Sequence, residues 1–98
     1  MFARVGTAQA AQSANSDDLA RRVKEIVVPV LKQQKGFKKL YTLLDRESGK
    51  AYSINFWDSE ADLKAFVESE TQAKLQAKMR EAGGPQMTWE NFEVMVES

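Results

Sequence analysis

Apolar residues in the first third of the chain follow two different spacings. The run FARVGTA, residues 2–8, predicts a short strand, and the small and polar residues after it suit a loop. From Leu19 onward, apolar residues recur every three or four positions, which predicts a helix over residues 17–34. Pro29 lies within this helix and has no backbone N–H for the carbonyl four residues earlier. We therefore expect a bend or a loosened final turn at Pro29, and an end of the helix at Gly36.

The remainder of the chain predicts a hairpin, a second helix and a last strand. Two β-rich runs, residues 36–45 and 50–57, flank the polar, glycine-containing turn DRESG, which is typical of an antiparallel hairpin. Ser59, with an acidic residue three positions later, indicates a helix start. The apolar spacing of this helix fails near Ser69 and then resumes, so we expect a kink there before Gly-Gly-Pro ends it. The alternating run MTWENFEVMVES predicts the fourth strand.

The order strand, helix, strand, strand, helix, strand predicts an α+β chain with the ferredoxin-like βαββαβ arrangement. Its four-stranded antiparallel sheet would carry both helices on one face. We expect residues 1–98 to form one domain, because 98 residues leave no room for a second one.

Alternation along the strands divides the side chains between the two faces of this sheet. We expect the helices to pack on a face made of Ala3, Val5, Leu40, Leu44, Tyr52, Ile54, Phe56, Phe92, Val94 and Val96. If no bulge shifts the register, the opposite face holds Phe2, Arg4, Lys39, Tyr41, Leu43, Ser53, Asn55, Trp57, Met87, Trp89, Asn91, Glu93 and Met95.

The opposite face predicts a homodimer. Two tryptophans on a face open to water would be a liability for a monomer, so we expect this face to pack against a second copy. The residues predicted at the dimer interface are Arg4, Tyr41, Trp57, Trp89, Asn91 and Glu93.

Composition removes most of the catalytic groups that small enzymes use. The chain contains no cysteine and no histidine, which excludes disulfides, thiolate or imidazole catalysis and sites that bind zinc, copper or haem iron through these residues. Fourteen basic and 14 acidic residues give no net charge, so neither a nucleic acid nor an anionic membrane is an expected partner. No window approaches the length and hydropathy of a membrane span, and a cytoplasmic location is the default expectation.

The segment VPVLKQQKGFKKLYTLLDRESGKAYSINFWDSEADLKAF contains a proline before the Gly-Phe that opens strand two, and a Trp-x-Ser-Glu junction that opens helix two. With these features the chain resembles the antibiotic biosynthesis monooxygenase family, within the dimeric α+β barrel superfamily. The resemblance implies a dimer whose two sheets close into a barrel, with ligand pockets between the sheet and the helices of each protomer. Members of the family include cofactor-independent oxygenases of polycyclic aromatic substrates and haem-degrading enzymes.

The resemblance disfavours haem degradation for this chain. The haem-degrading members use an asparagine on strand one and a tryptophan and a histidine on helix two. These roles fall on Val5, Phe66 and Gln76 here, and none of the three can take them over. Gln76 cannot replace an imidazole as iron ligand. We therefore expect neither a metal site nor a cofactor.

A second possibility is an activity similar to that of the cofactor-independent oxygenases. The active site of such an oxygenase needs only a water-excluding cavity and polar groups that orient a phenolate. The candidate residues for binding an aromatic or apolar small molecule are Thr42, Tyr52, Phe66, Gln72 and Gln76, and the candidates for a catalytic role are Tyr52 and Asn55. The alternative is a non-catalytic dimeric binding or interaction module in which every aromatic residue is packing. A pocket beneath helix two near Ser69 would favour the enzyme.

Overall fold

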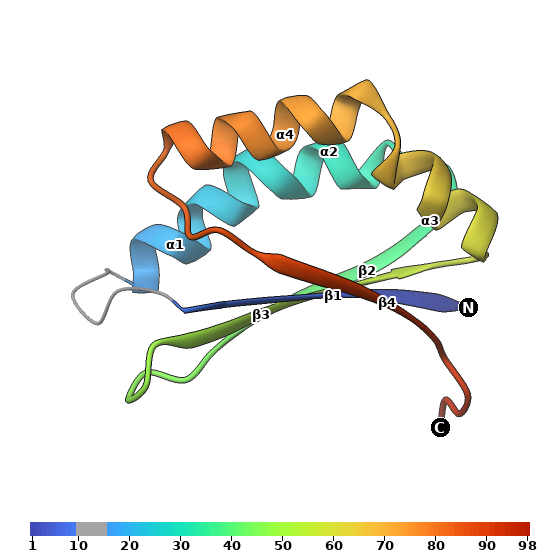
Figure 1. Ribbon diagram of the computed structural model, residues 1–98, viewed down its shortest axis with the longest axis horizontal. Coiled ribbons are helices and arrows are strands. Elements are labelled where there is room, and N and C mark those ends of the chain that lie inside the picture. The colour runs from blue at the N-terminus through green and yellow to red at the C-terminus, as the bar shows by residue number, and fades with distance from the viewer. Residues whose placement is uncertain (10–15) are drawn as a thin grey trace.

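The computed structural model describes residues 1–9 and 16–98, and it shows a layer of helices lying on one face of an antiparallel sheet (Figure 1). Part of the loop predicted after the first strand falls on residues 10–15, outside the described residues. In chain order the elements are β1 (Phe2–Gln9), α1 (Ser16–Arg22), the π-helical turn η1 (Val23–Val27), α2 (Val28–Lys32), β2 (Phe37–Leu44), β3 (Lys50–Trp57), α3 (Glu60–Val67), α4 (Glu70–Glu81) and β4 (Thr88–Glu93).

The strand order β2-β3-β1-β4, with every neighbouring pair antiparallel, confirms the ferredoxin-like α+β prediction. The two central strands, β3 and β1, are paired along their whole length, from Phe2 opposite Trp57 to Gln9 opposite Lys50. A bulge between Phe37 and Lys39 interrupts the register at the start of β2. None of the helices in the described part of the chain is long and apolar enough to cross a membrane.

The first predicted helix is irregular just before its proline. α1 and α2 are joined by η1, in which the backbone N–H of Val28 binds the carbonyl of Val23 five residues earlier. Pro29 has no N–H to donate, and in a regular α-helix its ring would crowd the carbonyl of Glu25, which lies inside η1. A π turn is one of the recognised ways in which a helix absorbs such a defect. The disturbance expected at Pro29 is therefore present, as a wider turn that precedes the proline.

The second predicted helix divides at Ser69, as its interrupted spacing indicated. Ser59 caps α3, and its Oγ accepts from the backbone N–H of Asp62 at 3.2 Å. Ser69 caps α4 in the same way, with the N–H of Gln72 at 3.1 Å. Because each helix has its own serine cap, α4 can change direction from α3 and lie along α1 and α2 above the sheet (Figure 1).

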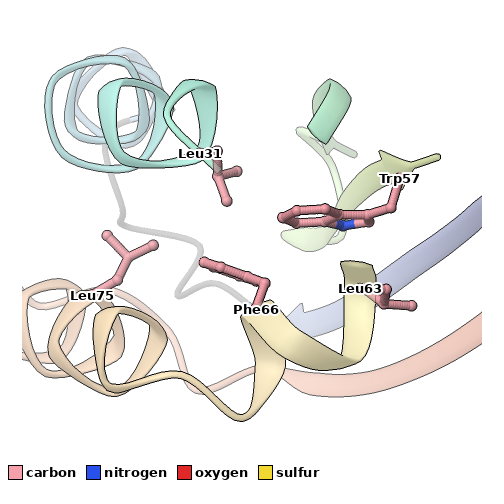
Figure 2. Packing of buried hydrophobic residues seen from close by; sticks show 5 residues of the cluster. All are labelled: Leu31, Trp57, Leu63, Phe66 and Leu75. Atoms are coloured by element: carbon pink, nitrogen blue, oxygen red, sulfur yellow. The ribbon is translucent and has the colours of Figure 1, made fainter. Parts of the chain in front are cut away.

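The hydrophobic core lies between the helices and the sheet, and Trp57 is its largest member. Figure 2 shows the Trp57 ring, which is fully buried, pointing toward Phe66 and Leu31. The rings of Trp57 and Phe66 are stacked with their centroids 5.0 Å apart, and Phe37 meets Trp57 edge-on at 5.7 Å. Leu63 and Leu75 complete the buried cluster.

This burial shows that the predicted assignment of sheet faces is wrong on three strands. The pairing puts Trp57 with Phe2, and Asn55 with Arg4 and Leu40, so these side chains lie on the helix side of the sheet. The predicted core positions Ala3, Val5, Tyr52, Ile54, Phe56 and Phe92 have the opposite parity and lie on the other side. On β2 the prediction is confirmed, since Leu40 faces the helices and Tyr41 and Leu43 face away from them.

With this correction, five of the six predicted interface residues lie on the helix side of the sheet and one lies on the other side. Arg4 and Trp57 are 5% and 0% exposed within one protomer, so they cannot present a surface to a partner. Trp89, Asn91 and Glu93 pair with Gly6, Arg4 and Phe2, which places them on the helix side of β4. Tyr41 alone of the six lies on the side away from the helices, and its part in a dimer stays a prediction.

We call the side of the sheet away from the helices the open face. Its apolar and aromatic members are Ala3, Val5, Tyr41, Leu43, Tyr52, Ile54, Phe56 and Phe92, and polar or charged members with the same parity include Thr7, Lys39, Lys50, Thr88 and Glu90. The open face is rich in apolar surface. Tyr41, Leu43 and Phe92 are each between 45% and 49% exposed, and Tyr41 meets Phe56 edge-on at 6.3 Å between ring centroids. The strand-four residue Val96, predicted in the core, lies beyond β4 and is 86% exposed.

Candidate functional site

A cavity of about 560 Å3 lies between the sheet and the helices, next to the buried cluster around Trp57. Its floor is the helix side of the sheet, with Arg4, Leu40, Thr42, Ala51, Ser53, Asn55 and Trp89. Its walls are helical, with Leu19, Val23, Val27, Leu31, Phe66, Gln72, Leu75, Gln76, Met79 and Arg80. Residues 84–87, between α4 and β4, complete the lining. A mostly apolar enclosure with few polar groups is the usual form of a small-molecule site.

All five residues predicted to bind a ligand border this cavity, although Tyr52 does so in an unexpected way. Thr42 comes from β2, Phe66 from the end of α3, and Gln72 and Gln76 from successive turns of α4. Tyr52 has the parity of the open face, and its ring lies 5.4 Å from Nζ of Lys50, which shares that parity. The backbone of Tyr52 therefore borders the cavity, while the prediction that its hydroxyl lies beneath the helices is wrong.

The second catalytic candidate, Asn55, has a structural partner. Asn55 is 3% exposed, and its Oδ1 accepts a hydrogen bond of 2.6 Å from Nε1 of Trp57. Both side chains project from the same side of β3, two residues apart, which is the spacing that brings strand neighbours onto one face. Asn55 thus satisfies the one polar atom of a buried tryptophan and also lines the cavity.

The most unusual group in the cavity is the guanidinium of Arg4. It lies 3.8 Å above the ring of Trp89, measured from Cζ to the ring centroid. The amide of Gln72 satisfies its neighbours when its oxygen faces Arg4, and this oxygen then accepts from both terminal nitrogens of Arg4 at 3.2 Å and from Nε2 of Gln76 at 3.0 Å. Among the described residues, no carboxylate forms an ion pair with Arg4.

Burial without a counter-charge changes the acidity of this group. Desolvation disfavours the charged form and lowers the pKa of Arg4 from its ordinary value to about 10. Arg4 is still protonated at neutral pH, so the cavity contains a buried positive charge, and its partners among residues 1–9 and 16–98 are a cation–π contact and a neutral amide.

The position of Trp89 depends on a glycine. A Cβ atom on Gly6 would lie 2.6 Å from Cζ3 of Trp89 and 2.8 Å from the Sδ-bound methyl carbon of Met87. Only a residue without a side chain lets the indole lie this close to β1, where it meets Arg4. The sequence contained a signal for this contact, because a glycine inside a strand often marks the close approach of another group. The pairing of Arg4 with Gln72 had no such signal, since it joins residues 68 positions apart in the chain.

The residues of the cavity do not fit a haem group. The chain contains no histidine and no cysteine, and the rings of Tyr41 and Tyr52 belong to the open face. Phe66 is stacked on Trp57, and Gln76 donates to Gln72, so neither supplies an iron ligand. Within residues 1–9 and 16–98, no group of three or more acidic, histidine or cysteine side chains could hold a metal ion.

The fold and the cavity together describe an α+β protein with a pocket between its sheet and its helices, and the sequence comparison identifies its family. The family model for antibiotic biosynthesis monooxygenase matches residues 1–78, and the chain belongs to this family. No curated protein matches the sequence.

Solved structures share the fold at low identity. The haem degrader MhuD from Mycobacterium tuberculosis, solved with two haems in its active site, is 15% identical with a TM-score of 0.72, covering 100% of this chain and 99% of that one. The cofactor-independent oxygenase SnoaB from Streptomyces nogalater is 14% identical, with a TM-score of 0.66 and coverage of 98% and 92%. Rv0793 from Mycobacterium tuberculosis is 13% identical, with a TM-score of 0.70 and coverage of 99% and 97%.

Proposed function

We propose that this protein binds a small aromatic molecule in the cavity between the sheet and the helices and oxidises it with dioxygen, without a cofactor. Family membership and the likeness to SnoaB and MhuD support a monooxygenase-like or small-molecule-binding function. The observation that carries the proposal is the cavity of about 560 Å3, whose apolar walls surround a few polar groups.

The chemistry asked of the protein is limited to binding, orientation and the exclusion of water. In an activated phenol such as an anthrone, the methylene carbon between two rings loses two hydrogens and gains one oxygen atom from dioxygen. The second oxygen atom leaves as water, and the substrate supplies all the electrons. Arg4, oriented by its hydrogen bonds to the Gln72 oxygen, would hold the phenolate oxygen, while Leu31, Phe66 and Leu75 surround the rings.

One observation favours the non-catalytic alternative, a binding module with the same cavity. Among the described residues, the side chains that line the cavity include no carboxylate, and both tyrosine rings lie on the open face. A general base would therefore have to be supplied by the substrate or by water. If the protein binds aromatic molecules but does not accelerate their oxidation, the binding module is the correct reading.

We also propose a homodimer in which the open faces of two sheets pack together. Tyr41, Leu43 and Phe92 leave nearly half of their surface exposed, and none of the helices that the structure describes covers this side of the sheet (Figure 1). An apolar patch on a chain of 98 residues is most simply buried by the same patch of a second copy. This interface replaces the one predicted from the sequence, which used Trp57, a side chain that the protomer itself buries, and Trp89, which lines the cavity on the helix side of the sheet.

Oxygen uptake with a panel of hydroquinones and anthrones tests the enzymatic proposal. The variant Gln76→Trp places a large ring at the exposed edge of the cavity and should reduce uptake and binding. The matched control is Gln33→Trp, the same change at an exposed position after α2 that does not line the cavity. If the protein binds aromatic molecules but consumes oxygen no faster than the blank, the enzymatic proposal is refuted and the non-catalytic binding module is favoured. If Gln76→Trp behaves like Gln33→Trp in binding, the cavity is not the site.

A further inference from the structure

We propose that the ligand of this cavity carries an ionised oxygen, as an aromatic carboxylate or phenolate does, and that Arg4 is the residue that receives it. This inference rests on the proposed function, because it assigns the ligand class of the same cavity. It follows from the state of Arg4 in the protein, and it adds a requirement for negative charge that an apolar cavity alone would not impose.

The first step is the unmatched charge of Arg4. A buried cation is normally paired with an anion, because desolvation is costly and a neutral partner recovers only part of the loss. Arg4 is 5% exposed, and its partners in the described part of the chain are a carbonyl oxygen of Gln72 and the ring of Trp89. Neither of them carries a negative charge. The anion that would complete the site has to come from outside these residues.

The second step is the charge of the whole lining. The charged side chains that line the cavity, within the described residues, are Arg4 on the floor and Arg80 at the exposed end of α4. No aspartate or glutamate joins them, although the chain as a whole has 14 acidic residues to balance 14 basic ones. The cavity is therefore positive in a protein without net charge. An anionic ligand is favoured there over a neutral one of the same shape.

The third step is the geometry around the guanidinium. Gln72 accepts one hydrogen bond from each terminal nitrogen of Arg4, and each of these nitrogens carries a second N–H. The stacking on Trp89 holds the guanidinium plane and leaves its edge for such bonds. A carboxylate or a phenolate oxygen can accept from this edge, while the rings of the ligand lie among Phe66, Leu75 and the other apolar residues of the wall.

The test compares charged and neutral molecules of the same shape by calorimetric titration at neutral pH. The carboxylate arm uses 2-naphthoate against 2-naphthamide. The phenolate arm uses 2,4-dinitro-1-naphthol, which is ionised at neutral pH, against its methyl ether. A charged hydrogen bond that the neutral probe cannot match is expected to favour the anion by roughly 10- to 100-fold in Kd. Comparing the two arms tells whether the carboxylate or the phenolate is the better ligand.

Two variants assign this preference to Arg4. Arg4→Gln removes the charge, and Gln72→Glu places a carboxylate against the same two nitrogens and so neutralises the charge from within the protein. Each should lower the ratio of anion to neutral affinity to about one, with little change in the Kd of the neutral probe. Arg46→Gln, in the turn between β2 and β3, removes an arginine that does not line the cavity and should keep the wild-type ratio.

The outcomes separate this inference from the proposed function. If the wild-type protein binds both members of each pair equally well, the aromatic site stands and the requirement for an anion is refuted. If no probe binds, the proposed function itself fails. A preference for anions that survives Gln72→Glu would also overturn the role of Arg4. Because Gln72→Glu is close to isosteric, it decides the matter even if Arg4→Gln does not fold.

Discussion

The replacement Gln72→Glu should make the protein more stable, because it gives the buried Arg4 a counter-charge. Burial lowers the pKa of Arg4 to about 10, and each pKa unit corresponds to about 1.4 kcal/mol, so burial disfavours the charged guanidinium relative to its neutral form by about 3 kcal/mol. A carboxylate in place of the Gln72 amide would accept from the same two nitrogens, which lie 3.2 Å from the present oxygen. These two charge-assisted bonds are shorter and stronger than those to a neutral amide.

The new carboxylate must also lose its own water, which removes part of this gain. We expect a net increase of about 1–2 kcal/mol in the free energy of unfolding at pH 7, or a Tm higher by about 5–10 °C for a chain of this size. The sign of the pH dependence follows from the pair. Arg4 lowers the pKa of the new Glu, so the extra stability is complete above the ordinary glutamate pKa of about 4.3 and is lost as the pH falls further.

Urea denaturation at pH 7 and at pH 3, followed by tryptophan fluorescence, measures both quantities. Gln33→Glu is the matched control, since it makes the same change at an exposed position and should alter stability by less than about 0.5 kcal/mol. The reasoning is refuted if Gln72→Glu is no more stable than the wild type at pH 7. It is equally refuted if the gain persists undiminished at pH 3, because a protonated glutamate cannot pair with Arg4.

Three further predictions concern other parts of the fold. Gly6→Ala should lower the free energy of unfolding by about 1–3 kcal/mol in urea, because the new methyl group would lie 2.6 Å from Trp89, and an unchanged value would show that the indole moves without cost. Ser69→Ala should lower it by about 0.5–2 kcal/mol by removing the cap of α4, and no loss would mean that another group satisfies this helix end. Phe92→Glu, at a side chain that is 49% exposed on the open face, should convert the proposed dimer to a monomer in sedimentation velocity, and a dimer of unchanged strength would refute that interface.

The order of elements could be predicted from the sequence because each boundary has a local cause. Ser59 and Ser69 bind the N–H groups at the starts of α3 and α4, and the irregular turn precedes Pro29 as its missing donor requires. These effects involve residues a few positions apart. A single sequence therefore contains all that is needed to place them.

The faces of the sheet could not be predicted in the same way. Alternation separates two sets of side chains but does not say which set meets the helices, and both sets here are rich in aromatic residues. Arg4 and Asn55 made the true inner set look too polar for a core, because the inner side of this sheet includes a cavity as well as packed side chains. The bulge between Phe37 and Lys39 changes the alternation at the start of β2 as well.

For the candidate site, the sequence predicted the residues on the helices more accurately than the residues on the strands. Phe66, Gln72 and Gln76 were named as candidate binding residues on helix two, and in the structure all three line the cavity. Their roles in binding stay predictions. Tyr52 was misplaced because its side depended on the face assignment. Arg4 was placed on the wrong side for the same reason, and its contact with Gln72 depends on tertiary packing.

The π turn η1 indicates that the helical segment between Leu19 and Leu31 can differ in length by one residue. Leu19 and Leu31 both line the cavity, although they are 12 residues apart, a separation that in a regular helix of 3.6 residues per turn would leave them about 120° out of line. A π turn takes up one surplus residue, and 11 residues bring the two leucines to within about 20°. A chain with one residue deleted from Val23–Val27 could therefore form a regular helix and still direct both leucines into the cavity. The wall of the cavity fixes the direction of these side chains, and the number of residues between them is free to differ by one.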